Sequence, residues 1–276
     1  MNDTTLTFIG GGNMAASLIG GLIADGWDPA RIRVADSSAE RLQQLSQQFP
    51  IYTNSDNCNA ADQADIIVLA VKPQVIQSVT RELTSLIAKQ QPLVISIAAG
   101  IPAGALGNWL GKSTAIVRTM PNTPAMVQSG ATVLYANEHV SEEQRSIAES
   151  ILRAVGVAIW IDDEALMDAV TALSGSGPAY FFLFMEALQA AGQELGLPQE
   201  TARLLTLQTA FGAAKMALES TKDAATLRHQ VTSPGGTTEH AIKAFQEGEL
   251  EALVSKALQA AAKRSHELAT EFGSDS

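Results

Sequence analysis

The pattern of apolar positions divides the chain into two halves. In the first half, short apolar runs alternate with longer stretches in which apolar residues recur every three or four positions. The short runs are typical of buried strands and the longer stretches of amphipathic helices. A first strand is expected over Thr5 to Ile9, and later strands over 32–35, 66–71, 93–99, 115–118, 132–135 and 157–161. Strands that alternate with helices predict an α/β fold with a doubly wound parallel sheet.

The pattern changes after Asp162 and Asp163. The last helix before this point is expected to begin after Ser141, because Ser141 and Gln144 have the spacing of a capping box. Beyond it, segments rich in alanine and leucine predict helices over 164–173, 179–195, 199–219, 238–246 and 249–272. We therefore expect an α/β domain over 1–162 and an all-helical domain over 163–276. The helical half has few aromatic residues and carries small residues on several faces, so it is expected to bury its surface against a second copy.

Composition narrows the classes of function. The chain has 276 residues, 46% of them hydrophobic, and no apolar run approaches the ~18 to 20 residues that span a bilayer. The N-terminus lacks a basic segment followed by an apolar one, so we expect a cytoplasmic protein without a signal peptide. A net charge of −11 argues against nucleic acid and anionic membranes as partners. Neither a disulfide within the chain nor a metal site is expected, because there is one cysteine and the histidines are scattered (Cys58, His139, His229, His240 and His266).

A glycine-rich turn follows the first strand and precedes a helical stretch. Gly10, Gly12 and Ala15 have the spacing G-x-G-x-x-[GA], which places a pyrophosphate against the N-terminus of a helix. Gly10 would make the tight turn, and Gly12 would let the backbone approach the phosphates. Alone, this spacing also fits a glycine-rich turn of any α/β protein, but its place between strand and helix favours a dinucleotide site.

The end of the second strand leaves the choice of cofactor open. Asp36 follows Ala15 by about 20 positions, the spacing of the acid that binds a ribose hydroxyl of NAD. Ser37, Ser38 and Arg41 could instead hold the 2′-phosphate of NADP. Both NADH and NADPH therefore stay candidates.

Three further strand ends carry proline and polar residues. The turns after Ala70 and after Ser96 could line the cofactor, although proline that simply ends a strand explains each of them equally well. In the third, Pro121 and Pro124 stiffen a polar loop around Asn122. Such a rigid loop suits a nicotinamide carboxamide.

Two loops of the helical half are rich in glycine and hydroxyl groups. Residues 173–180 and 231–238 each open a helix, where unpaired N–H groups can bind an anion such as a substrate carboxylate. Their composition alone also fits ordinary turns between helices. Both loops lack the charged residues usual in surface turns, and this favours a binding site.

Five segments together resemble the successive signatures of the pyrroline-5-carboxylate reductase family. They are 8–14, 70–74, 120–124, 173–180 and 233–238, in this order over nearly the whole chain. The resemblance implies a Rossmann domain followed by an all-helical dimerisation domain, with dimers that can assemble further. It also implies reduction of the cyclic imine Δ1-pyrroline-5-carboxylate to L-proline, the last step of proline synthesis, with NADPH or NADH as cofactor.

The motifs and the resemblance together give the expected site residues. Cofactor contacts are expected at Gly10, Gly11, Gly12, Asn13, Met14, Asp36, Ser37, Asn57, Ala70, Val71, Lys72, Pro73, Ser96, Ile97, Ala98 and Asn122. Substrate contacts are expected at Ser174, Gly175, Ser176, Gly177, Pro178, Gly235, Gly236 and Thr237.

The expected site contains hydroxyl and amide groups but no evident nucleophile, so the cofactor must carry the reaction. Reduction of an imine fits, because it needs a hydride on the carbon, a proton on the nitrogen and good alignment. We expect Thr238 to hydrogen-bond the ring nitrogen, with the N–H groups of Gly235, Gly236 and Thr237 holding the carboxylate. A β-hydroxyacid dehydrogenase is an alternative, but such enzymes use a lysine on the first long interdomain helix, and 163–196 contains none. A dinucleotide-binding sensor without catalysis is a third interpretation.

Overall fold

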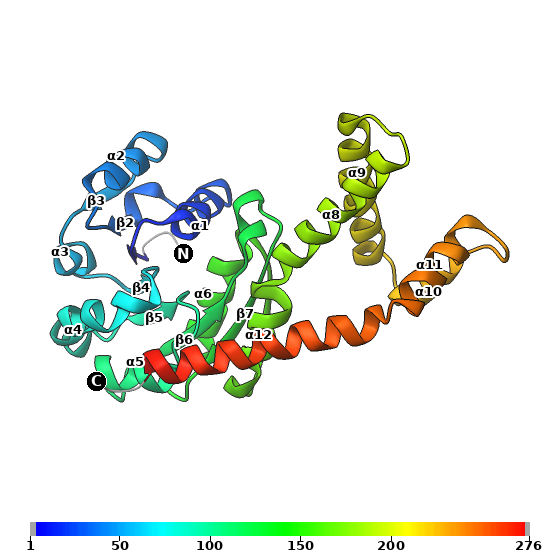
Figure 1. Cartoon of the computed structure of the whole chain (residues 1–276). Helices are drawn as coiled ribbons and strands as arrows, with labels where there is room; N and C mark the ends of the chain where they lie inside the picture. The colour runs from blue at the N-terminus through cyan, green and yellow to red at the C-terminus, as the bar shows by residue number, and fades with distance from the viewer. Residues whose placement is uncertain (1–3, 274–276) are drawn as a thin grey trace. The chain divides into compact units, whose positions relative to one another are not determined.

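The computed structural model describes residues 4–273. The chain divides into two compact units (Figure 1). The first comprises the chain up to Ser176 together with the stretch from Ala261 to the end of the described residues, and the second is Gly177–Ala260. The last helix, α12 (Leu250–Gly273), therefore contributes residues to both units.

The first unit is built on a sheet with the strand order β3-β2-β1-β4-β5-β6-β7-β8. The strands are β1 (Leu6–Ile9), β2 (Ile32–Ala35), β3 (Tyr52–Asn54), β4 (Ile66–Leu69), β5 (Leu93–Ser96), β6 (Ile116–Met120), β7 (Gly130–Ala136) and β8 (Gly156–Trp160). The predicted strands all form. The additional strand β3 is a short edge strand with an exposed Tyr52, so it lacks the apolar run that identified the others.

The sheet is mixed, which corrects the prediction of a parallel sheet. Strands β1 to β6 pair in parallel, but β7 runs antiparallel to β6. The reason is the short connection between them, which holds only the 3-10 turn η2 (Thr123–Val127) and is too short for a helical crossover. Strand β8 follows helix α6 (Glu142–Arg153) and is parallel to β7 again.

Helices cover both faces of this sheet, so its central strands are buried on both sides. Leu6 and Phe8 of β1 join a core with α1 (Asn13–Ala24), α2 (Ala39–Gln48) and α6. Ile9 joins a second core with α3 (Asn57–Ala61), α4 (Pro73–Gln90) and α5 (Ala103–Leu110). Alternate residues of one strand thus reach opposite cores. This is why the strands read as continuous apolar runs in the sequence.

The start of α6 has the predicted capping box. The Ser141 hydroxyl accepts a hydrogen bond from the Gln144 N–H at 3.2 Å, and the Gln144 side chain accepts one from the Ser141 N–H at 2.9 Å. A short 3-10 turn, η1 (Pro29–Arg31), precedes β2.

The segment expected as one helix over 164–173 consists of three short pieces. They are the 3-10 turn η3 (Glu164–Leu166), the helix α7 (Met167–Val170) and the π-turn η4 (Thr171–Gly175). A π-turn carries one extra residue per turn and often occurs at functional sites.

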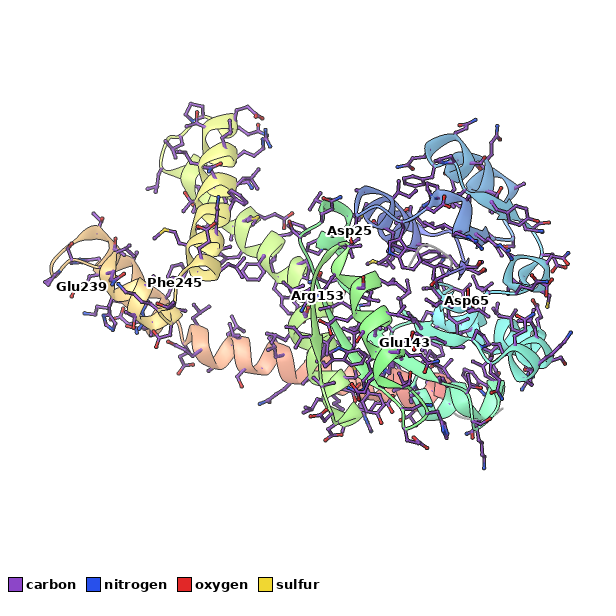
Figure 2. All side chains as sticks on the ribbon, turned by 180° about the vertical axis from the view of Figure 1, so that it is seen from behind. Asp25, Asp65, Glu143, Arg153, Glu239 and Phe245 are labelled. Atoms are coloured by element: carbon purple, nitrogen blue, oxygen red, sulfur yellow. The ribbon has the colours of Figure 1, made fainter. Side chains whose placement is uncertain are left out.

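The second unit is entirely helical. It contains α8 (Gly177–Glu194), α9 (Gln199–Glu219), α10 (Ala224–Gln230), α11 (Thr237–Glu247) and the first part of α12. Helix α10 was not predicted because it is short; it begins after Asp223, whose carboxylate accepts the Thr226 N–H at 2.7 Å. The rings of Phe184 in α8 and Phe245 in α11 lie 5.9 Å apart. Figure 2 labels Phe245 on its helix.

Candidate active site

Five expected segments lie at one edge of the sheet. The register pairs Ile9 with both Ala35 and Leu69, and Ser96 with both Leu69 and Arg118. The chain leaves the sheet directly after these positions in β1, β2, β4 and β5, and two residues later, after Met120, in β6. Because all five strands run in the same direction, the segments at 10–14, 36–38, 70–73, 97–98 and 121–122 meet at their carboxyl ends, where ligands of open α/β sheets bind.

The glycine loop fits a dinucleotide pyrophosphate. Gly10 has φ +101°, and a methyl group there would lie 2.6 Å from the carbonyl oxygen of Ala70. Gly12 caps α1 without a side chain, and a methyl group on it would meet no atom within 4 Å. The first turn of α1 has no acidic residue. The N-terminal N–H groups of α1 therefore face open space, as an anion site requires.

Asp36 and Arg41 both contact the glycine loop. The Asp36 carboxylate accepts the Gly11 N–H at 2.7 Å through Oδ2 and the Ser38 N–H at 2.8 Å through Oδ1. The Arg41 guanidinium donates from Nε to the Gly11 carbonyl and from Nη2 to Asn13 Oδ1 at 3.4 Å. Gly11 is thus held through both its N–H and its carbonyl group.

Asn57 begins α3 and is hydrogen bonded to α4. Its Nδ2 donates to Glu82 Oε2 at 2.9 Å. The neighbouring Cys58 thiol lies 3.4 Å from the Glu82 carbonyl oxygen. Burial, followed by the charges of Asp56 and Glu82, raises the pKa of the Cys58 thiol, so it stays protonated at neutral pH.

The turns after β4 and β5 are shaped by local contacts. Lys72 precedes α4, and Pro73 is the first residue of this helix, where a missing N–H costs nothing. Ser96 is fully buried, and its hydroxyl accepts the Ala98 N–H at 3.3 Å. The buried side chain of Ser96 therefore holds the turn in its conformation.

Asn122 joins two motifs that are far apart in the sequence. Its Nδ2 lies 3.2 Å from the Ser174 carbonyl oxygen and 3.3 Å from the Ser174 hydroxyl, and its Oδ1 accepts the Ala131 N–H at 2.9 Å. A methyl group on Gly175 would collide with the Met120 side chain. The π-turn therefore lies directly against the carboxyl end of β6. The sequence predicted both motifs but not that they touch.

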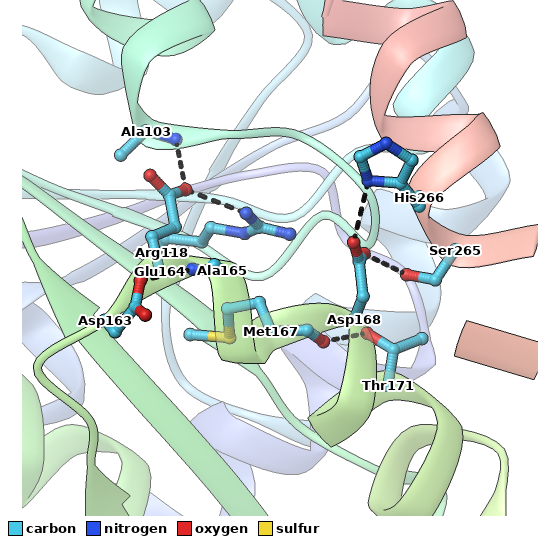
Figure 3. A network of polar contacts seen from close by, with 10 residues as sticks. All are labelled: Ala103, Arg118, Asp163, Glu164, Ala165, Met167, Asp168, Thr171, Ser265 and His266. Carbon is cyan, nitrogen blue, oxygen red and sulfur yellow. Dashed lines mark hydrogen bonds and ion pairs between the residues drawn. The ribbon is translucent and has the colours of Figure 1, made fainter. Parts of the chain in front are cut away.

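Two polar clusters hold the segment before the π-turn in place (Figure 3). Glu164 Oε1 accepts the Ala103 N–H at 2.7 Å and pairs with the buried Arg118 guanidinium at 2.8 Å. The Asp168 carboxylate accepts the Ser265 hydroxyl at 2.7 Å and lies 3.2 Å from the His266 ring nitrogen Nδ1. These contacts were not predicted, because the partners lie far apart in the sequence and no local pattern indicates them.

The second unit contains the loop that was expected to hold the substrate carboxylate. Gly235 has φ +71°, and its N–H donates to the Glu239 carboxylate at 2.7 Å. The Gly236 N–H donates to the Ser233 carbonyl at 3.0 Å. Two of the three N–H groups expected to bind the substrate therefore already have acceptors, one in α11 and one in the loop. Those of Thr237 and Thr238 begin α11, where a helix offers no internal acceptor.

A cavity of about 670 Å³ adjoins this loop within the second unit. Its lining includes Pro234 and Glu239 together with the cationic side chains of Arg228 and Lys243. The two cationic side chains favour an anionic ligand, whereas the Glu239 carboxylate in the first turn of α11 opposes one.

Residues 4–273 contain neither a candidate metal site nor a candidate membrane-spanning helix. No group of three or more His, Cys, Asp and Glu side chains comes together there as a metal site. In the same part of the chain, no helix combines the length and apolarity needed to cross a membrane.

Family models match both parts of the chain. Residues 5–100 match the family of NADP oxidoreductases described as coenzyme F420-dependent, and residues 164–268 match the pyrroline-5-carboxylate reductase dimerisation domain. A pyrroline-5-carboxylate reductase of Pseudomonas aeruginosa is 54% identical over 99% of this chain and 100% of its own length. The chain belongs to the pyrroline-5-carboxylate reductase family.

Other members extend the likeness to plants and to solved structures. The Arabidopsis thaliana reductase is 40% identical over 95% of this chain and 94% of its own. A pyrroline-5-carboxylate reductase structure from Coxiella burnetii has a TM-score of 0.93 at 51% identity, covering 97% of this chain and 99% of that one. A Plasmodium falciparum pyrroline carboxylate reductase with NADP bound has a TM-score of 0.86 at 31% identity, covering 98% and 99%. These relatives confirm the predicted family and fold class, and they favour neither alternative function.

Proposed function

We propose that this protein reduces Δ1-pyrroline-5-carboxylate to L-proline with NADPH or NADH. The observation that carries this proposal is the 54% identity, over nearly the whole chain, to a relative named pyrroline-5-carboxylate reductase. The five signature segments support it, since each lies at the carboxyl edge of the sheet or at the start of a helix.

The proposed cofactor site follows the edge of the sheet. The N–H groups at the start of α1 bind the pyrophosphate, and the residues after β2 and at Asn57 bind the adenosine end. The turns of 70–73 and 96–98 flank the cofactor. The loop with Asn122, stiffened by Pro121 and held to Ser174, places the nicotinamide. When bound, the reduced nicotinamide supplies the hydride that the imine carbon receives.

The proposed substrate site uses the turn at 174–178 and the loop at 235–238. The N–H groups of Thr237 and Thr238 donate to the substrate carboxylate, because those of Gly235 and Gly236 already have acceptors. The half-buried Thr238 hydroxyl hydrogen-bonds the ring nitrogen and donates or relays its proton. This contact aligns the imine for hydride transfer and stabilises the nitrogen as it becomes an amine.

We also propose that the minimum assembly is a homodimer, formed by the helical domain over 163–276, and that dimers can assemble further. The support is the match to a dimerisation domain and the large apolar side chains that α8 and α9 expose, such as Phe182 and Leu204. Exposed apolar area of this kind marks an interaction surface. The Rossmann domain over 1–162 is the other half of this proposed division.

The activity is tested by following the loss of nicotinamide absorbance when the purified protein meets Δ1-pyrroline-5-carboxylate, with L-proline identified as product. We expect turnover that depends on the imine. No turnover with either cofactor, despite measurable dinucleotide binding, would contradict the proposal and favour a sensor.

Thr238→Ala tests the proposed role of the hydroxyl. It should lower kcat about 100-fold, the range of a lost proton-transfer group, with the cofactor dissociation constant unchanged. Thr238→Ser, which keeps the hydroxyl, should retain most of the activity. Equal rates for Thr238→Ala and the unaltered protein would exclude this role.

A further inference from the structure

A polar contact inside the first unit joins two segments that are far apart in the sequence. The hydroxyl of Ser265, a residue only 5% exposed, donates to Asp168 Oδ1 at 2.7 Å (Figure 3). Asp168 Oδ2 lies 3.2 Å from Nδ1 of His266. One carboxylate thus contacts two successive side chains of α12. The proposed function uses none of these three residues.

These are the segments by which the chain leaves the first unit and returns to it. Asp168 lies in α7, shortly before the first unit ends at Ser176. Ser265 lies in α12, shortly after the chain returns to this unit at Ala261. The contact therefore joins, within the first unit, the two connections to residues 177–260.

Asp168 is also directly connected to the turn at Ser174. Helix α7 continues without a break into the π-turn η4, where the Ser176 N–H donates to the Thr171 carbonyl at 2.9 Å. Ser174 itself receives the hydrogen bonds of Asn122. The π-turn and the short helix before it are therefore held at two places, by Asn122 from the end of β6 and by α12 through Asp168.

The part of α12 that contacts Asp168 is itself fixed to the first unit. Leu268 lies against Gly100, where an added methyl group would be 3.7 Å from the Leu268 Cβ atom. Phe272 packs against the core formed with α4 and α5. A hydrogen bond between a carboxylate and a buried hydroxyl is stronger than one between neutral groups in water. This part of α12 is thus an ordered support for the segment that contains Asp168.

We propose that Asp168 is a positioning residue for the reduction of the imine. By binding Ser265 and His266, it keeps the turn at Ser174 in the conformation that receives the substrate, and it acts through the π-turn without contacting the substrate. This inference rests on the proposed function. It adds a residue outside the five signature segments on which turnover depends.

Asp168→Ala removes both contacts to α12. Steady-state kinetics should show kcat/KM for Δ1-pyrroline-5-carboxylate lowered about tenfold or more, because a small displacement of a group that aligns the substrate has a large effect on the rate. The dissociation constant of NADP⁺, measured by calorimetry without imine, should change less than about twofold, because sites that share no partners behave independently. A general loss of structure would lower both.

Three further variants make the result specific. In Asp168→Asn, the side-chain oxygen can accept the Ser265 hydroxyl and the N–H₂ group can donate to His266 Nδ1, so most of the activity should be retained. Ser265→Ala should also lower kcat/KM, and combining it with Asp168→Ala should add nothing, because both act through one contact. Asp162→Ala, which removes an exposed carboxylate from the same segment, should leave kcat/KM unchanged.

Hydrogen exchange measured by mass spectrometry follows the turn without any substrate. The amides of 171–176 should exchange about fivefold faster or more in Asp168→Ala, whereas those at the start of α6 should not change, because only the local opening near the lost contact becomes easier. If exchange changes in this way but the unaltered protein reduces no imine, the proposed function fails while the effect of Asp168 on the turn stands.

Four results would overturn the inference. Asp168→Ala could have the kcat/KM of the unaltered protein, or it could lose NADP⁺ affinity as strongly as it loses kcat/KM. Asp168→Asn could be as inactive as Asp168→Ala, or exchange in 171–176 could stay the same. Melting temperatures show whether Asp168→Ala has failed to fold. In that case Ser265→Ala decides, and an unchanged kcat/KM in this variant would exclude the positioning role.

Discussion

The two units of this protein differ in how far each buries its own apolar side chains. In the first unit, the strands and the helices that cover them bury large residues such as Phe8, Leu18 and Ile67 completely. In residues 177–260, the buried side chains are the small ones of Ala202 and Thr206, while Phe181 is 68% and Leu218 is 85% exposed. The first unit therefore has a core of its own, and the second has apolar faces that need a further surface to cover them.

The candidate site residues follow the same division. In the first unit, Asn122 and Arg41 are each held by two or more hydrogen bonds to other segments, and Asp36 is held by one to Gly11 and one within its own loop. In the second unit, the loop before α11 is held by bonds within the loop and its own helix. We infer that the proposed cofactor site is organised by the first unit alone, whereas the loop proposed to hold the substrate carboxylate depends on what packs around the helices of the second unit.

The largest effect is expected on dimer formation, from a change in the exposed apolar face of the second unit. Leu204→Asp puts a carboxylate on the exposed face of α9, and burying it in a homodimer would cost about 3 kcal/mol or more in each copy. We expect sedimentation equilibrium to show monomers where the unaltered protein forms dimers, with NADP⁺ affinity retained. Ser85→Asp, on an exposed position of α4, is the control and should leave the dimer intact. A dimer that survives Leu204→Asp would move the interface away from this face.

An intermediate effect is expected on the free energy of unfolding, from the loss of an ion pair in the first unit. Glu164→Gln leaves the buried Arg118 guanidinium without a counter-charge and should lower the free energy of unfolding by about 3 kcal/mol. All three tryptophans (Trp27, Trp109 and Trp160) lie in this unit, so their fluorescence during urea denaturation reports on it alone. The exposed Glu143→Gln should change stability by less than about 0.5 kcal/mol. Equal losses for the two variants would show that the ion pair is dispensable.

The smallest effect is expected on KM for the substrate, from a change of charge beside the loop that precedes α11. Glu239→Gln can still accept the Gly235 N–H but removes a negative charge from beside the proposed carboxylate site. We expect KM for Δ1-pyrroline-5-carboxylate to fall about threefold with kcat unchanged, because repulsion between two exposed carboxylates is weak. Glu247→Gln, at the far end of the same helix, is the matched control. A KM that stays the same or rises would place the substrate carboxylate elsewhere.

Much of the fold was predictable because its signals are local. The apolar run of β1, the turn at Gly10 and the stripe of α1 are contiguous, and the structure places each where it was expected. The capping box at Ser141 was predictable for the same reason. Helix α10 and strand β3 were missed because both are short and neither contains a run of buried apolar residues.

The strands, most of the helices and the residue types at the strand ends follow from local sequence, because they depend on neighbours within a few positions. The antiparallel direction of β7 and the hydrogen bonds from the backbone to both Asp36 oxygens depend on how the folded chain packs. The same packing brings Asn122 to Ser174, which lies 52 positions further along the chain. Contacts of this kind depend on how strands and turns pack in space. The spacing of residues along the chain does not predict them.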